Sequence, residues 1–174
     1  MKRGGLKPVD DRKVIERVLK GDTEAFNLLV RQWEKPIYNF IVRMIGDRDE
    51  AMDLCQEAFM KAYRELDTLK DLDRFSAWLY RIAHNTCFSK LRKDQGKRFV
   101  ELEPETQAST MPMESRLAVE KALAHLPEDQ REVVVLKVFQ SLKFAEIAAL
   151  QGAPVSTVKS RLYMGFEKLR SILE

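Results

Sequence analysis

FAEIAALQGAPVSTVKSRL, residues 144–162, has the spacing of a helix-turn-helix. Ala148 is small where two helices must cross closely, and Gly152 can adopt the left-handed conformation of a turn. Pro154 can begin a helix but would break one, so we expect the turn to lie here. Val158 should then point back to the core and anchor the second helix.

The second of these helices is expected to expose polar side chains. Those on its free side are Ser156, Thr157, Lys159, Ser160 and Tyr163. Hydroxyls and a cation near a helix N-terminus suit the base edges and phosphates of a DNA major groove. A helical hairpin with no ligand could share the spacing of small residues, but the proline and the polar face together favour DNA binding.

Helical periodicity covers most of the remaining chain. Apolar residues recur three and four apart in four stretches of the first half, and again over residues 115–125 and 130–139. Pro36 lies inside one stretch, so we expect a kink or a break near Glu34 and Lys35. Residues 133–135 are three β-prone valines, but they have no turn pair and no partner strand, which favours a buried helix.

The periodicity disappears between Phe99 and Glu114. This segment holds two prolines and four glutamates and has no basic residue, as expected of a flexible acidic linker. We therefore predict an all-α chain made of two small helical domains, residues 10–95 and 115–174, joined by a linker over residues 96–114.

Composition limits the class of protein without identifying it. Thirty basic and 27 acidic residues in 174 leave a net charge of +3, which is too small to indicate a partner. Two cysteines cannot build a disulfide framework, which favours a reducing compartment. No wholly apolar run is longer than the four residues 133–136, far below the ~20 that span a bilayer. We expect a soluble, cytoplasmic protein.

Charge is unevenly distributed in the first domain. Residues 47–73 hold nine acidic and four basic residues, net −5, whereas residues 81–98 hold six basic residues and one acidic residue, net +5. One surface therefore suits a basic protein partner and another suits nucleic acid.

Three blocks occur in a fixed order: DLCQEAFMKAY at 53–63, FSAWLYRIAHN at 75–85, and the helix-turn-helix. Together they closely resemble bacterial RNA polymerase sigma factors of the extracytoplasmic-function (ECF) type, over about residues 11–95 and 115–172. The resemblance implies that the first domain is sigma region 2 and the second is sigma region 4. It implies an alternative sigma factor that binds core polymerase, recognises the −35 and −10 promoter elements, melts the −10 region and initiates transcription.

In this family, the first block docks on the clamp helices of the polymerase β′ subunit. The matching residues here are Asp53, Gln56, Glu57 and Met60. They lie at i, i+3, i+4 and i+7, which places them in one helical stripe whose carboxylates can pair with arginines. Phe59 and Tyr63 are expected to face the core.

In this family, a short loop captures a base that is flipped out of the −10 non-template strand. The loop here is Leu69, Lys70, Asp71, Leu72, Asp73 and Arg74, and the resemblance implies that Asn85 helps to read the base. Extruding a base costs a few kcal/mol of stacking, and an asparagine can return hydrogen bonds bidentately. Phosphates could be held by Arg81, Lys90, Arg92 and Lys93. Trp78 is either a stacking platform or a core residue, and we favour the core.

Region 4 of the family reads the −35 element. The matching residues are Ser156, Thr157, Lys159, Ser160, Arg161 and Tyr163. Met164 stands where many relatives have a basic residue, so the promoter preference is not carried over. The implied partners are core RNA polymerase (β′ clamp helices and β flap), promoter DNA and an anti-sigma factor, with no small-molecule substrate.

We find no catalytic set and expect no enzyme, cofactor or metal site. His84 and Cys87 share a helical face, but Cys55 and His125 lie elsewhere, so two buried thiols explain the cysteines better than zinc or redox sensing does. One alternative is a stand-alone helix-turn-helix transcriptional regulator, which leaves the acidic stripe and Asn85 without a role. Another alternative is an adaptor that binds polymerase but not DNA. The polar recognition face argues against this alternative.

Overall fold

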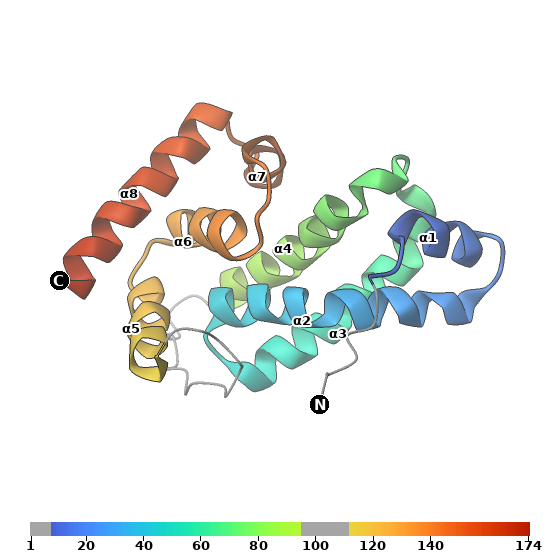
Figure 1. Cartoon of the computed structure of the whole chain (residues 1–174), viewed down its shortest axis with the longest axis horizontal. Coiled ribbons are helices and arrows are strands. Elements are labelled where there is room, and N and C mark those ends of the chain that lie inside the picture. Colours follow the sequence, from blue (N-terminus) through green and yellow to red (C-terminus); the bar gives the residue numbers. More distant parts are fainter. Residues whose placement is uncertain (1–7, 95–111) are drawn as a thin grey trace.

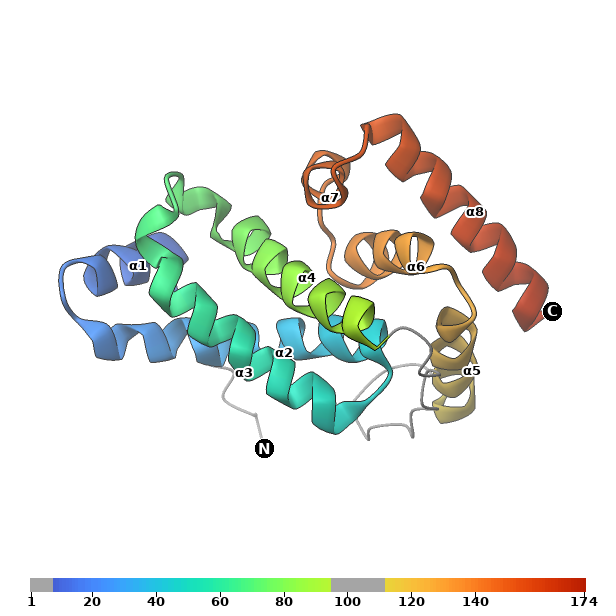
Figure 2. The same cartoon turned by 180° about the vertical axis from the view of Figure 1, so that it is seen from behind.

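The computed structural model describes residues 8–94 and 112–174, and these residues form two packed helical bodies. Figure 1 shows the first body, α1 to α4, beside the second, α5 to α8, and Figure 2 shows the same arrangement from behind. Within the described ranges, all regular structure is helical. The predicted all-α fold with two domains is therefore confirmed.

The first body is built on three long helices. Its elements are α1 (Asp11–Leu19), η1 (Thr23–Ala25), α2 (Phe26–Ile45), α3 (Arg48–Glu65), η2 (Leu66–Thr68), η3 (Leu72–Arg74) and α4 (Phe75–Lys93). Helix α2 is followed by Gly46, whose φ of 79° is left-handed, and the Asp47 side chain then caps α3 by accepting a hydrogen bond from the Glu50 amide at 2.9 Å. A glycine followed by an acidic cap thus folds α3 back along α2.

A kink or a break was expected near Glu34 and Lys35, but helix α2 continues through Pro36 without a break. Three residues that follow the proline, Ile37, Phe40 and Ile41, are completely buried. Burying three such side chains contributes about 1.5–3 kcal/mol each. This exceeds the cost of about 3 kcal/mol for a proline in a helix interior.

The second body contains the predicted helix-turn-helix. Its elements are α5 (Met113–Ala124), α6 (Glu128–Val134), the π-helical turn η4 (Val135–Phe139), α7 (Phe144–Gln151) and α8 (Val155–Leu173). Gly152 has a φ of 59° between α7 and α8, and both Ala148 and Val158 are buried, as their spacing predicted. The three valines 133–135 are buried in helical backbone, also as predicted.

The linker predicted for residues 96–114 lies almost entirely outside the described residues. Only its last three positions are described, and α5 begins within them, at Met113. Among the residues that are described, no helix is long and apolar enough to cross a membrane.

The two bodies share one hydrophobic cluster. It includes Phe40 and Tyr80 of the first body together with Val133, Leu136 and Ile147 of the second. Helix α4 lies against α7, and α2 lies against α5, α6 and η4. The apolar faces of both bodies are thus buried partly against each other.

Helix α8 crosses α6 at a glycine. A Cβ atom on Gly165 would lie 3.0 Å from Cγ2 of Val134, which is closer than two carbon atoms normally approach. A glycine inside a helix costs about 0.5–1 kcal/mol relative to alanine. The close approach of α6 explains why this cost is accepted here.

We predict that Gly165→Val destabilises the protein by about 1–3 kcal/mol, because its branched side chain would overpack against Val134. The measurement is urea unfolding followed by circular dichroism. The matched control is Lys168→Val, on the exposed face of the same helix, for which we expect a loss below about 1 kcal/mol. Equal losses in the two variants would show that the contact between α6 and α8 is not tight.

Candidate functional site

The α3 stripe (Asp53, Gln56, Glu57 and Met60) is exposed over its whole length. These four side chains, with Lys61 and Arg64, line a hollow of about 260 Å³. Met60 is 55% exposed, and Lys61 Nζ pairs with Glu57 Oε1 at 2.6 Å. An apolar methionine beside two carboxylates is a surface that a basic protein partner can cover.

Tyr63 does not face the core as the sequence predicted. Phe59 is buried, but Tyr63 is 44% exposed and packs its ring edge-on against Phe26, with centroids 5.1 Å apart. Phe26 is the first residue of α2, so Tyr63 lies at the end of that helix, where its ring is only partly covered. Met52 is also exposed, at 54%, and the sequence analysis did not identify it as part of this surface. Helical spacing places both side chains beside Gln56 and Met60, so they widen the apolar part of the stripe.

The loop of residues 69–74 is acidic, but its carboxylates are paired. Arg12 of α1 donates two hydrogen bonds to Asp73, Nε to Oδ1 at 3.0 Å and Nη2 to Oδ2 at 2.8 Å. Asp71 accepts a bond from the Asp73 amide at 3.1 Å and pairs with Arg74 at 3.4 Å. Neutralisation by two arginines reduces the repulsion that this loop would otherwise exert on a phosphate backbone.

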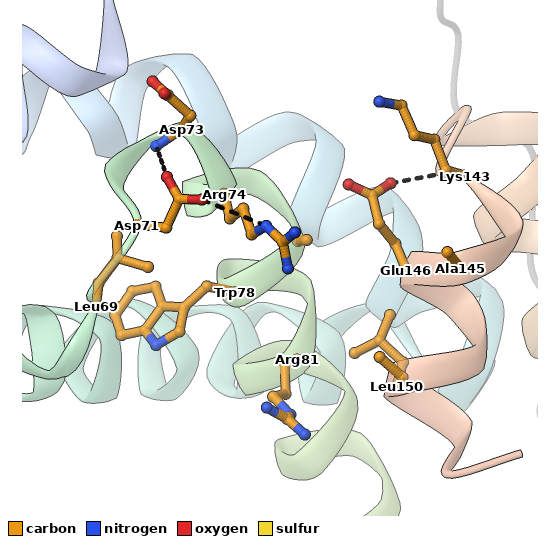
Figure 3. A pocket seen from close by; sticks show the side chains of 12 residues that line it. Leu69, Asp71, Asp73, Arg74, Trp78, Arg81, Lys143, Ala145, Glu146 and Leu150 are labelled. Carbon is orange, nitrogen blue, oxygen red and sulfur yellow. Dashed lines mark hydrogen bonds and ion pairs between the residues drawn. The ribbon is translucent and has the colours of Figure 1, made fainter.

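Trp78 is half-buried, between the two roles considered for it. Its ring lies 5.9 Å from that of Phe75, on the wall of a cavity of about 470 Å³ that Leu69 and Arg81 also line. Figure 3 shows this cavity, with α4 and the 69–74 loop on one side and α7 on the other. Asn85 is exposed one helical turn beyond Arg81, so both are open to solvent on α4.

The basic residues at the end of α4 are not equally available. Lys90 pairs with Glu50 at 2.6 Å and with Asp94 at 3.1 Å, and these hydrogen bonds raise the pKa of Lys90 to about 12. Arg92 and Lys93 are exposed, although Arg92 Nε also donates to the Phe88 carbonyl at 3.1 Å. Lys90 must therefore release two carboxylates before it can hold a phosphate.

The recognition face of α8 is open. Ser156, Lys159, Ser160 and Tyr163 are exposed, and Thr157 is half-buried. Tyr163 is 67% exposed, and the ammonium of Lys159 lies 5.6 Å from the ring centroid of Phe144. This face presents hydroxyls and a cation without competing ion pairs among the described contacts of these side chains.

Arg161, by contrast, ties helices together. Its Nε pairs with Asp129 Oδ2 at 2.9 Å, and its Nη1 donates to Gln151 Oε1 at 2.8 Å. Gln151 in turn donates to the Asp129 carbonyl at 3.0 Å and to Glu132 Oε2 at 2.9 Å. This network fixes α8 against α6 and α7. The residues of this network are far apart in the chain and no spacing pattern links them, so the network was not predictable from the sequence.

Cys55, Cys87 and His84 do not form a joint site. Cys55 and Cys87 are buried, and burial raises the pKa of both thiols, that of Cys55 to about 12. His84 Nδ1 hydrogen-bonds Glu132 Oε1, and its ring stacks on Phe88. Over the part of the chain that is described, no group of three or more His, Cys, Asp or Glu side chains is placed to hold a metal ion.

Comparison with known proteins gives a consistent result. Residues 29–97 match the family model Sigma-70 region 2, and residues 116–169 match Sigma-70, region 4. The chain is 35% identical to the RNA polymerase sigma-H factor of Pseudomonas aeruginosa, over 94% of both chains. It is 34% identical to the ECF RNA polymerase sigma factor SigW of Bacillus subtilis, over 93% of this chain and 96% of SigW.

Two solved structures have a similar fold. The sigma factor RpoE of Bartonella quintana, in complex with the anti-sigma factor NepR, superposes with a TM-score of 0.76 at 25% identity, covering 85% of this chain and 96% of that one. CnrH in complex with the cytosolic domain of CnrY gives 0.73 at 28% identity, covering 94% of this chain and 96% of CnrH.

The bond between Arg12 and Asp73 holds the pKa of the Asp73 carboxyl below its ordinary 3.8. We predict that Arg12→Ala returns this pKa to the ordinary value, as measured by carboxyl ¹³C NMR during a pH titration. Because the folded-state pKa is the lower one, the stability from this pair is present above about pH 4 and is lost as the pH falls through the folded pKa. Arg17→Ala, which removes a pair with Asp22 instead, should leave Asp73 unchanged. An unaltered titration in Arg12→Ala would contradict the pairing.

Proposed function

The chain belongs to the sigma-70 family as an alternative RNA polymerase sigma factor of the ECF type, and from this premise we propose that residues 10–95 bind core polymerase and the −10 element while residues 115–174 bind the −35 element. The acidic segment 96–114 then connects two DNA-binding bodies. The separation of an acidic protein-binding surface from basic nucleic-acid surfaces supports this division.

The α3 stripe is the surface that contacts the polymerase, at the clamp helices of the β′ subunit. The observation that carries this proposal is that Asp53, Gln56, Glu57 and Met60 are all exposed on a helix that packs against both α2 and α4. A helix buried on one side that keeps carboxylates and a methionine on the other presents both charge and apolar area to a partner.

The 69–74 loop, Asn85 and Arg81 form the −10 surface. A flipped base needs a pocket that offers polar groups and a flat apolar contact, because extrusion loses stacking. The cavity beside Trp78 supplies an indole, and the paired carboxylates of the loop supply hydrogen-bond acceptors. Arg92 and Lys93 hold phosphates further along the strand.

The −35 surface is the open face of α8, with Ser156, Thr157, Lys159, Ser160 and Tyr163 directed at the major groove. Arg161 acts differently from the role implied by family resemblance. Its bonds to Asp129 and Gln151 make it a positioning residue that sets the angle of α8.

The partners are core RNA polymerase, at both the β′ clamp helices and the β flap, and promoter DNA. An anti-sigma factor is a further partner, which is supported by the structure of RpoE in complex with the anti-sigma factor NepR. The protein acts as an initiation factor in the cytoplasm, where polymerase and chromosome are found, and the nucleotide chemistry belongs to the polymerase.

The test is transcription from a promoter library by core polymerase with and without the pure protein. We expect specific initiation only when both are present. In the same assay, Asp53→Arg with Glu57→Arg should lower core affinity by about 100-fold or more, because like charges would then face each other. Stability should change by less than about 1 kcal/mol, since exposed charges contribute little to it.

The matched control reverses two other exposed acids, Glu24→Arg with Glu34→Arg, and should bind core normally. Full core affinity in the α3 variant would show that the stripe is not the docking face. DNA binding without initiation would instead indicate a stand-alone regulator, and core binding without DNA recognition would indicate an adaptor.

Lys159→Glu should weaken binding of preformed holoenzyme to a promoter duplex. It should also reduce the slope of log affinity against log salt by about 0.9, the value for one phosphate contact. Lys168→Glu makes the same charge change on an exposed part of α8 outside the proposed surface and should leave the slope intact. If both variants keep the slope of the native protein, Lys159 does not touch a phosphate.

A further inference from the structure

The exposed face of α8 changes in character along its length. It begins with hydroxyls and a cation, on Ser156, Lys159 and Ser160, and continues with two large side chains that are mostly carbon, Tyr163 and Met164. Tyr163 is 67% exposed and Met164 is 52% exposed. A single exposed apolar side chain is ordinary on a protein surface, but these two follow directly on the residues proposed to enter the major groove.

Helical spacing places Met164 on the same face. Ser156, Lys159, Ser160 and Tyr163 lie at i, i+3, i+4 and i+7, and Met164 lies one turn after Ser160. The Ser160 hydroxyl contacts the Met164 sulfur, with Oγ 3.9 Å from Sδ. A thioether is a weak acceptor, so this bond is weak, but it holds the sulfur beside a residue of the proposed DNA surface.

The apolar part of this face is bounded on both sides. Glu167 lies one turn after Tyr163, and its carboxylate pairs with Arg170 at 2.8 Å. A carboxylate there is unfavourable next to DNA phosphates, so we expect the duplex contacts of α8 to end near Met164. Gly165 is buried against α6. Met164 therefore lies at the edge of the DNA-facing surface, between the polar side chains and the acid that limits it.

The chemistry of a thioether distinguishes one base from the other three. In the major groove, thymine presents a C5 methyl group, whereas the other distinguishing groups of the four bases are hydrogen-bond donors and acceptors. Methionine placed over a donor or an acceptor would leave that group unpaired, which is costly. Its side chain is unbranched and polarizable, so it can adapt to the shape of a methyl group. Met164 therefore suits thymine.

We propose that Met164 is a specificity-determining residue that selects a thymine in the −35 element by covering its C5 methyl group. Ser160 holds the thioether in place. Lys159 and the hydroxyls bind the duplex through polar contacts, and Met164 adds a preference that depends on buried apolar area and not on charge. The inference rests on the proposed −35 role of α8 and adds to it a base that the helix prefers.

The test is uracil substitution in the −35 element, because uracil pairs as thymine does and lacks only the C5 methyl group. Holoenzyme made from core polymerase and the full chain selects a promoter from the library, and each −35 thymine is then replaced singly by uracil. We expect one position at which uracil weakens holoenzyme binding by about fourfold, the factor for one buried methyl-sized group. Since the contact is uncharged and releases no counterion, this factor should be the same at low and high salt.

Three variants connect the effect to Met164. Met164→Ala should lower the uracil effect at that position to less than about 1.5-fold, because no methyl contact remains to be lost. Ile172→Ala shortens another exposed apolar side chain of α8, beyond Glu167, and should keep the full effect. Met164→Arg supplies two donors that suit O6 and N7 of guanine, so a new selection should replace the thymine by guanine at that base pair or its neighbour.

An element that tolerates uracil at every −35 thymine would overturn the inference. So would a uracil effect that persists in Met164→Ala, or a selected −35 element without thymine. These results leave the proposed function intact, because the holoenzyme still selects and binds a promoter. Failure to select any promoter would instead remove the proposed function, and the assignment of Met164 with it.

Discussion

Arg131 and Glu132, adjacent in α6, are both buried, and the helices around them depend on how these two charges are satisfied. Arg131 donates to the carbonyls of Leu123, Ala124 and Leu126 at 3.0–3.1 Å, which closes the end of α5, and to the end of α2. Removing one partner of a buried, hydrogen-bonded charge typically costs 3–5 kcal/mol. This segment therefore holds α5 to α6 and, through His84 and Met44, holds the two bodies together.

The same constraint reaches α8. Glu132 accepts a bond from Gln151, Gln151 accepts one from Arg161, and Arg161 pairs with Asp129 one turn before Glu132. A continuous polar network thus connects α4 of the first body to α8 of the second. The angle of α8 and the contact between the two bodies therefore depend on the two carboxylate oxygens of Glu132.

The proposed protein-binding and DNA-binding surfaces differ in how their charges are paired. The α3 stripe is exposed, and its carboxylate Glu57 pairs with Lys61 of the same helix, whereas charged side chains near the proposed DNA surfaces are held by partners on other elements. Lys90 is held by Glu50 and Asp94, and Asp73 is held by Arg12. If the proposed surfaces bind DNA, these pairs between elements must rearrange before the charged groups can contact a polyanion.

Local features of the sequence determined the helices, the helix-turn-helix and the α3 stripe. Gly152, Pro154 and the spacing of apolar residues act within one or two turns, where backbone sterics and periodicity decide the outcome. Only the tertiary structure decided that α2 runs through Pro36, that Tyr63 is left half uncovered, and that Lys90 and Arg161 are engaged. Each of these depends on burial or on a partner distant in sequence, and the closed placement of the two bodies depends on both.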